Sequence, residues 1–339
     1  MKVCVVGTGA IGGFLGVRLA HAGHDISLIA RGPHLAAIQS NGLKLIQDGE
    51  QLIANNVVAT SNISELSAQD VVIMALKAHQ IAAIVDKLPH LFGKDTVVVT
   101  VQNGIPWWYF QNMGQNLSRE YANRTVETVD PGGVLKSAID AHRILGCIAY
   151  PAMVIVEPGV IQHIEGVRFP VGELDGADSA RVNRISEMFI EAGFKSPVLP
   201  DIRSEIWLKL WGNLSFNPIS AVTHATLEAI CQYPLTRELA ASMMLEAQAV
   251  AEKLGASFRV TVERRIEGAE KVGKHKTSML QDVESGKPLE IDGMLGAVIE
   301  LAEVTATDVP ALKSIYACVC LLNKTIADEQ VSIKGWPRQ

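Results

Sequence analysis

The chain has 339 residues, of which 48% are hydrophobic and 19% are charged, and its formal net charge is −6 with a pI near 5.9. This length favours two domains over one core, and the composition is that of a globular protein rather than a disordered one. The acidic balance argues against a nucleic-acid partner, because phosphate binding requires a basic surface.

The five cysteines are scattered without framework spacing, which indicates reduced thiols and a cytoplasmic protein. Cys318 and Cys320 could form half of a metal site, but no Cys or His cluster supplies the other half, so we expect no metal. The long uncharged run 210–227 contains Asn, Pro and His and predicts no membrane span.

The N-terminal segment combines an apolar strand, KVCVV, a glycine turn, GTGAIG, a helix that ends on Gly23, and a second strand, DISLIA. Such glycines allow a tight turn and the close approach of a pyrophosphate at the positive end of the helix. G-x-G-x-x-G alone is a weak signal, but in this context it predicts a dinucleotide site. The residues expected to contact the cofactor there are Gly7, Thr8, Gly9, Ala10, Ile11 and Gly12.

The residue after the second strand predicts which dinucleotide binds. An NAD site favours Asp or Glu for the ribose hydroxyls, whereas here Arg31 stands, and the next carboxylate is Asp48. A guanidinium suits a 2′-phosphate, so the sequence favours NADPH over NADH. An exposed arginine at the end of a strand is the structural alternative.

Further apolar segments predict strands at 70–77, 96–104 and 145–156, with helical segments between them. Strands that alternate with helices are typical of a parallel, doubly wound sheet. Two of these strands end in polar residues, Lys77 and Asn103, and ligands lie at the C-terminal ends of such strands. Solvent-exposed loop positions are the alternative for both residues.

From about residue 201 the periodicity is helical, and no alternating strand follows. We therefore expect a Rossmann-like α/β domain over 1–200, with an insertion at about 105–144, and an all-α domain over 201–339. Pro197 and Pro200 mark the connection. A cleft between two such domains is the usual place for a small-molecule substrate, and a homodimer through the helical domain is left open.

The segment WLKLWGNLSFNP, 207–218, carries an ammonium and two amides along one face of an apolar helix. Lys209, Asn213 and Asn217 recur at a spacing of four, so they share that face. A lysine there must be desolvated or paired, which lowers its pKa or costs free energy, and a cleft would make this tolerable. A solvated stripe with a snorkelling lysine is the alternative. Pro218 is expected to kink or end the helix.

Taken together, these segments resemble the ketopantoate reductases (2-dehydropantoate 2-reductases) over nearly the whole chain. The resemblance rests on order and spacing as well as residue type, in GTGAIGG, the Arg31 position, LKAHQ, VQNG, WLKLWGNLSFNPISA and SMLQDVESGKPLEIDG. It implies NADPH-dependent reduction of the ketone of 2-dehydropantoate to pantoate, the step that feeds pantothenate and coenzyme A.

The resemblance also implies roles for individual residues. NADPH would lie on the glycine turn, with Arg31 at its 2′-phosphate and with Lys77, Ala152 and Glu290 near the cofactor. Asn103 would bridge the nicotinamide and the substrate. Lys209 would be the general acid, and Glu290 would close the site. The substrate would be held by Asn103, Asn213, Asn217 and Ser278, together with Lys209. Ser278 could instead cap a helix through SMLQ, and Glu290 could favour the dipole of a helix that begins there.

Two departures from the family pattern bear on the substrate. The connection 105–144, which contains Trp107 and Trp108, is longer than is typical, and Leu227 stands where several members have a further substrate-facing Asn. Because the insertion leaves the strand that ends in Asn103, we expect it to border the substrate. It motivates an alternative, a reductase of another branched or aromatic 2-oxo acid. An NADPH-binding sensor without turnover is the alternative of a different class.

Overall fold

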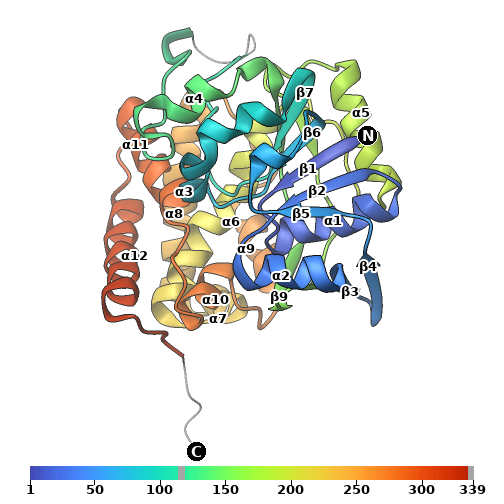
Figure 1. The fold of residues 1–339 in the computed structure, drawn as a ribbon. Coiled ribbons are helices and arrows are strands. Elements are labelled where there is room, and N and C mark those ends of the chain that lie inside the picture. Colours follow the sequence, from blue (N-terminus) through green and yellow to red (C-terminus); the bar gives the residue numbers. More distant parts are fainter. Residues whose placement is uncertain (114–118, 335–339) are drawn as a thin grey trace, which may run out of the picture.

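The computed structural model describes residues 1–113 and 119–334, and its N-terminal half is built on two sheets while its C-terminal half is helical (Figure 1). A seven-stranded sheet has the order β11-β8-β7-β6-β1-β2-β5. Its strands are β1 (Lys2–Val6), β2 (Asp25–Ile29), β5 (Val58–Thr60), β6 (Gln69–Met74), β7 (Phe92–Thr100), β8 (Ile144–Cys147) and β11 (Val171–Glu173). All neighbours pair in parallel except β11, which runs antiparallel to β8, so the expected parallel sheet is mixed at one edge.

The continuous apolar sequence of the central strands follows from burial on both faces. In β1, Val3 and Val5 belong to one hydrophobic cluster, and Cys4 and Val6 belong to the cluster on the other side. The first helix and the helices around the sheet are α1 (Ala10–His21), α2 (Gly32–Asn41), α3 (Ala78–Ile81) with the 3-10 helix Ala82–Leu91, and α5 (Ala180–Glu191). This core positions the C-terminal ends of the parallel strands at one edge.

A second, four-stranded sheet has the order β4-β3-β10-β9, with β3 (Leu43–Gln47), β4 (Glu50–Ala54), β9 (Ala152–Glu157) and β10 (Val160–Glu165). The single strand expected at 145–156 is therefore wrong, because it is divided between β8 and β9, which lie in different sheets. Pro151 stands at the break, where a residue without an N–H cannot donate to a ladder. The strand expected at 96–104 likewise ends at Thr100, and Asn103 follows in a loop.

The 105–144 connection contains short helices at Arg119–Tyr121, Pro131–Gly133, α4 (Val134–Ala138) and Ala141–Arg143. Its aromatic run is core rather than surface: Trp107 is 4% exposed and Trp108 is 1% exposed. The indole of Trp108 donates to Thr100 Oγ1 at 2.9 Å, and the indole of Trp207 donates to the Tyr109 hydroxyl at 2.8 Å. This part of the insertion therefore joins the sheet to the helical half.

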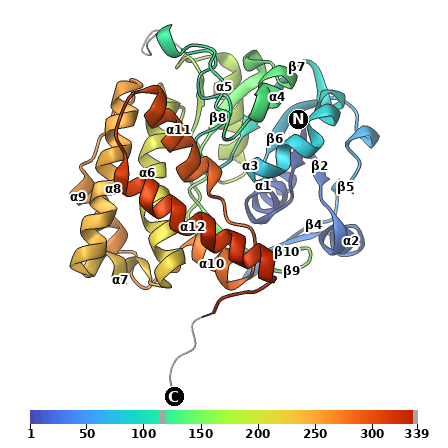
Figure 2. The ribbon, with the colours of Figure 1, turned by 90° about the vertical axis from the view of Figure 1, so that its left-hand side faces the viewer.

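The helical half is arranged around α6 (Ile202–Thr223), which lies between α8 and the sheet-containing half in Figure 2. The other helices are α7 (Leu227–Gln232), α8 (Pro234–Lys253), α9 (Val262–Glu270), α10 (Ser278–Glu284), the π-helix Asp292–Gly296, α11 (Ala297–Val304) and α12 (Pro310–Glu329). Within the described residues, no helix is long and apolar enough to cross a membrane.

Pro218 was expected to kink or end the helix, and it does not end it, because α6 continues to Thr223 and is closed by His224 in the left-handed conformation. A proline inside a helix costs about 3 kcal/mol through its missing hydrogen bond and its steric clash. Pro218 and both its neighbours are buried, so packing from surrounding helices offsets this cost.

Candidate active site

The glycine turn connects β1 to α1 and leaves the start of the helix open. Gly7 has φ +101°, and a Cβ at Gly12 would lie 2.1 Å from the Gly7 carbonyl oxygen, so both positions require glycine. Gly9 is the N-cap of α1, no side chain caps the helix there, and nothing lies within 4 Å of where its Cβ would be. Thr8, Ala10 and Ile11 complete the turn. The amides from Gly9 to Gly12 and the open space at Gly9 fit a phosphate group.

Arg31 stands beside this turn. The amides of Gly7 and Thr8 both donate to the Ile29 carbonyl oxygen, at 3.2 and 3.1 Å, so the turn is joined to the end of β2 two residues before Arg31. Arg31 itself is exposed and is the N-cap residue of α2. Its guanidinium is therefore available on the same edge of the sheet as the glycine turn.

Lys209 joins the two halves of the chain. Its ammonium donates to Asn103 Oδ1 at 2.6 Å and to the Ala149 carbonyl oxygen, which lies at the end of β8. Burial lowers the pKa of Lys209 to about 8, although the charge of Glu290 opposes part of this shift. The ammonium is thus desolvated and held by two neutral acceptors rather than by a carboxylate.

The amides further along α6 face the start of α10. Asn217, 6% exposed, donates to Ser278 Oγ at 3.4 Å, while Asn213 is half-buried and makes no hydrogen bond to the described residues. The alternative in which Ser278 caps a helix is wrong, because Thr277 is the N-cap and its hydroxyl accepts from the Leu280 amide. The Ser278 hydroxyl is therefore left to the polar face of α6.

Glu290 lies in a small recess next to Asn103. The recess is lined by Asn103 and by residues 289–294. The Ile105 amide donates to the Gly293 carbonyl oxygen at 2.8 Å, and a Cβ at Gly104 would lie 2.2 Å from that oxygen. The helix expected to begin at Glu290 begins instead at Asp292, as a π-helix with Ile291 as its N-cap, so Glu290 directly precedes the N-cap and the dipole alternative stays open.

Lys77 and Ala152 lie apart from this cluster. The ammonium of Lys77 donates to Asp282 Oδ2 at 3.0 Å and to the Pro288 carbonyl oxygen at 3.4 Å, so it connects the end of β6 to α10. Ala152 opens β9, a strand that packs against α1. Sequence reasoning missed Asp282, although it belongs to the SMLQD segment that contains Ser278.

A further polar group was also missed. Glu205, 2% exposed, accepts from the Tyr150 hydroxyl and from Arg168, both at 2.7 Å, and from Arg259. Burial alone would raise the pKa of Glu205, but these hydrogen bonds outweigh it and lower the pKa to about 2. The sequence offered one sign of this residue: Glu205 precedes Lys209 by four positions and so lies on the same face of the helix. Its three partners could not be found from the sequence, because they lie far from it along the chain.

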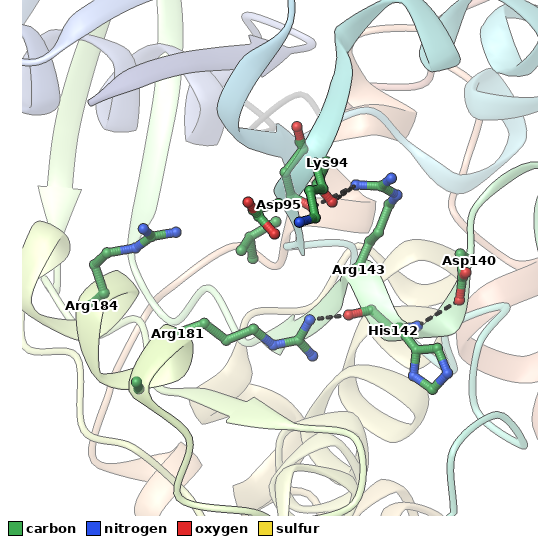
Figure 3. A pocket seen from close by; sticks show the side chains of 10 residues that line it. Lys94, Asp95, Asp140, His142, Arg143, Arg181 and Arg184 are labelled. Carbon is green, nitrogen blue, oxygen red and sulfur yellow. Dashed lines mark hydrogen bonds between the residues drawn. The ribbon is translucent and has the colours of Figure 1, made fainter.

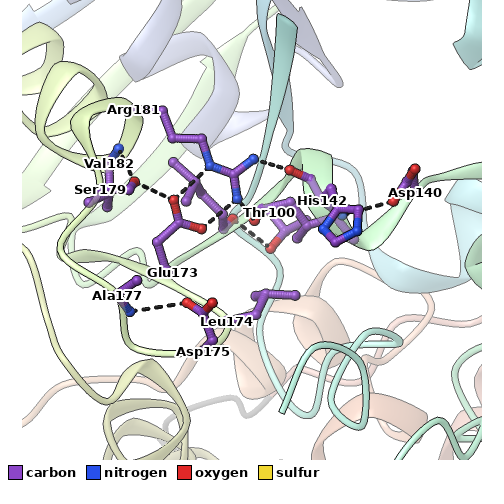
Figure 4. A network of polar contacts seen from close by, with 12 residues as sticks. Thr100, Asp140, His142, Glu173, Leu174, Asp175, Ala177, Ser179, Arg181 and Val182 are labelled. Carbon is purple, nitrogen blue, oxygen red and sulfur yellow. Dashed lines mark hydrogen bonds and ion pairs between the residues drawn. The ribbon is translucent and has the colours of Figure 1, made fainter. Parts of the chain in front are cut away.

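The molecule also has a larger recess, at the opposite edge of the seven-stranded sheet (Figure 3). It is lined by the first part of β7, by Asp140 to Arg143, and by the start of α5. Figure 4 shows that Arg181 is committed there to Glu173, with Nε–Oε1 at 2.6 Å and Nη2–Oε2 at 2.5 Å, and that it also donates to the His142 carbonyl oxygen. This edge holds the N-terminal ends of β7 and β8, where ligands of such sheets do not bind.

A glycine turn among parallel strands, together with a helical half that carries a desolvated lysine and the unpaired amide of Asn213, defines a dinucleotide-dependent oxidoreductase. Comparisons with known proteins agree with this class. Residues 3–119 match the family model "Ketopantoate reductase PanE/ApbA", and residues 201–323 match "Ketopantoate reductase PanE/ApbA C terminal".

Individual relatives give the same result. The chain is 51% identical over 320 residues to the 2-dehydropantoate 2-reductase of Mesorhizobium japonicum, covering 94% of this chain and 97% of that protein. A solved structure from Ralstonia solanacearum MolK2, assigned provisionally as a ketopantoate reductase, has a TM-score of 0.90 at 36% identity and covers 96% and 98% of the two chains. The 2-dehydropantoate 2-reductase of Geobacter metallireducens GS-15 has a TM-score of 0.81 at 25% identity, with 96% and 99% covered. The chain belongs to the ketopantoate reductase family.

Proposed function

We propose that the protein is an NADPH-dependent 2-dehydropantoate 2-reductase, which reduces the ketone of 2-dehydropantoate to the alcohol of pantoate. The observation that carries the proposal is the desolvated ammonium of Lys209, held by Asn103 and the Ala149 carbonyl oxygen at the junction of the two halves. The nicotinamide, when bound, supplies the hydride. Lys209 donates a proton to the ketone oxygen, and its charge stabilises the developing alkoxide.

The cofactor residues follow from the open end of α1. Gly7 and Thr8 shape the turn, the amides from Gly9 to Gly12 hold the pyrophosphate, and Arg31 holds the 2′-phosphate, which favours NADPH. Lys77 is a further cofactor residue. Its ammonium either leaves Asp282 to bind a phosphate of the cofactor, or binds that phosphate with an N–H donor that Asp282 does not use. Ala152 and Glu290 remain candidates for cofactor binding. For Glu290, the support is its position in the recess beside Asn103.

The substrate residues are Asn103, Asn213, Asn217 and Ser278, with Lys209. Support comes from Asn213, which has no hydrogen-bond partner among the described residues, and from the Asn217–Ser278 contact beside it. These groups offer donors and acceptors for the hydroxyl and carboxylate of the acid. The buried positions of Trp107 and Trp108 weaken the alternative of an aromatic substrate, because neither ring is free to stack on one.

Four further expectations also remain proposals. A domain boundary near residue 200 is supported by the bridge of Val198 to the sheet and by Asp201, which caps α6. An insertion that borders the substrate is supported by the Ile105–Gly293 bond beside the recess. A cytoplasmic location is supported by five free thiols, and a homodimer through the helical half is to be tested by sedimentation.

The test of the function follows NADPH absorbance with purified protein and a panel of 2-oxo acids. We expect the highest kcat/KM with 2-dehydropantoate, and a lower value with NADH in place of NADPH. A higher kcat/KM with another branched or aromatic 2-oxo acid would replace the proposed substrate. NADPH binding without turnover on any member of the panel would support the sensor alternative.

A further inference from the structure

Two successive residues of the connection between β8 and β9, Ala149 and Tyr150, are both held by side chains of α6. The carbonyl oxygen of Ala149 accepts from the Lys209 ammonium, and the Tyr150 hydroxyl donates to Glu205 Oε1 at 2.7 Å. Glu205 precedes Lys209 by four residues, so the two side chains leave the same face of the helix. These four residues form a closed cycle, in which the acceptor of the ammonium is covalently joined to the residue that Glu205 holds.

The connection at 148–151 has no regular secondary structure, so the position of the Ala149 carbonyl group depends on a few anchors. One of them is the amide of Tyr150, which donates to the Arg168 carbonyl oxygen at 3.1 Å and reaches the segment before β11 rather than α6. Among the hydrogen bonds of the described residues, the bond from the Tyr150 hydroxyl to Glu205 is the one that joins this connection to α6 without involving Lys209.

Glu205 is itself fixed in place. It is 2% exposed, and it accepts from Arg168 at 2.7 Å and from both terminal nitrogens of Arg259. A Glu four residues before a Lys commonly pairs with it on a helix, but none of the ion pairs between described residues joins Glu205 to Lys209. Two guanidinium groups match the carboxylate charge, so Glu205 acts on Lys209 by contact through Tyr150 and leaves the ammonium to neutral acceptors.

We infer that Glu205 is a positioning residue for the proton donor: through Tyr150 it fixes the Ala149 carbonyl oxygen, which holds the Lys209 ammonium toward the ketone. The inference rests on the proposed function. The Tyr150 ring adds a second contact, because its centroid lies 5.9 Å from Lys209 Nζ, within the range of a cation–π interaction. An ammonium on a flexible four-carbon stem takes one position only where its surroundings are fixed, and proton transfer depends on that position.

Loss of the Ala149 acceptor would change the pKa of Lys209 in a known direction. A hydrogen bond from the ammonium to a carbonyl oxygen stabilises the charged form, so its loss lowers the pKa. Of the titratable groups that face Lys209, Glu290 raises its pKa most, and Cys147 adds to this. Burial raises the pKa of the Cys147 thiol, and it raises the pKa of Tyr150 to about 12, so both stay neutral around pH 8. Glu290 is unchanged in every variant below.

The first test is Tyr150→Phe, which removes only the hydroxyl that donates to Glu205. We expect kcat for 2-dehydropantoate to fall about three- to tenfold, the size of one lost hydrogen bond, with the KM for NADPH unchanged. The falling limb of the pH profile should move to lower pH by about half a unit to one unit. Tyr109→Phe is the matched control, because it removes a hydroxyl that also holds α6, by accepting from Trp207 at 2.8 Å, and it should leave the limb in place.

The second test is Glu205→Gln, which removes the carboxylate and should move the limb in the same direction. Glu173→Gln is its matched control, because Glu173 is also a buried carboxylate with an arginine partner, but belongs to the cluster of Figure 4. Glu173→Gln should lower the stability to urea without moving the limb. A purely structural role for Glu205 predicts that both variants behave like Glu173→Gln.

An NMR titration of the Lys209 ε-carbon, assigned by its absence from Lys209→Ala, gives the pKa shift without turnover. If Lys209 titrates in folded Tyr150→Phe and Glu205→Gln as it does in the wild type, the inference is overturned, whatever their kcat, while the proposed function stands. If the wild type reduces no 2-oxo acid, the proposed function fails, and the titration alone decides whether Glu205 fixes the ammonium through Tyr150.

Discussion

The two charged regions of this molecule, at opposite edges of the seven-stranded sheet, differ in how completely their charges are paired. Arg181 has its guanidinium on Glu173 and on backbone carbonyl oxygens, so four of its five N–H donors are already in use. Lys209 instead has two neutral acceptors and a lowered pKa. A charge paired with an opposite charge indicates a structural cluster, whereas a desolvated charge without a carboxylate partner indicates a functional one.

The largest expected effect concerns Lys209. Lys209→Ala removes the proton donor and the charge that faces the alkoxide, so kcat should fall at least about a hundredfold. Stability to urea and the NADPH dissociation constant should change little, because the lysine is desolvated and lies away from the glycine turn. Stopped-flow kinetics measures kcat, urea denaturation measures stability, and fluorescence titration measures the NADPH dissociation constant. A variant with near-normal kcat would return this lysine to a solvated stripe.

The opposite pattern is expected of Arg181. Arg181→Leu leaves the carboxylate of Glu173, 4% exposed, without its cation, and should lower the free energy of unfolding by roughly 2–3 kcal/mol. Arg181 is partly exposed, so the expected loss is at or below the smallest losses that are typical when a buried ion pair is broken. Urea denaturation gives the free energy. A large loss of kcat/KM in the folded variant would show that the far edge takes part in function.

Arg31 tests the cofactor side of the active edge. Arg31→Asp removes the partner of the 2′-phosphate and adds a repulsive charge, so the NADPH-to-NADH ratio of kcat/KM should fall by about tenfold to a hundredfold. The kcat with saturating NADPH should stay near the wild-type value. An unchanged ratio would mean that Arg31 is only an exposed residue at the end of β2.

The smallest effect is expected at the Lys77–Asp282 ion pair, which is partly exposed. Asp282→Asn removes the carboxylate that pairs with the Lys77 ammonium. If Lys77 binds a cofactor phosphate, its ammonium then becomes more available for that phosphate. The KM for NADPH should then fall about two- to fivefold. A steady-state titration with NADPH at saturating 2-oxo acid measures it, and an unchanged KM would remove Lys77 from the cofactor site.

The features that sequence reasoning predicted well are those encoded within a short window. The glycine turn between β1 and α1 and the polar face of α6 depend on neighbouring residues, and the structure has both. The features it missed depend on distant contacts. The break of 145–156 between two sheets reflects the pairing of β9 with β10, and Glu205 acquires its role from Tyr150, Arg168 and Arg259.

Local rules also failed where packing overrode them. Pro218 stays inside α6 because its surroundings are buried, and the cap of α10 is Thr277 rather than Ser278, although both residues favour that position.

The measurement that tests the central claim most directly is the pH dependence of kcat/KM for the 2-oxo acid with saturating NADPH, in the wild type and in Lys209→Ala. A general acid must be protonated, so activity should fall as pH rises through the pKa of Lys209, about 8, rather than through the ordinary lysine value of 10.5. The variant should lose this falling limb. A wild-type profile that stays flat to pH 10, or a limb near pH 8 that persists in Lys209→Ala, would contradict the assignment of Lys209 as the proton donor.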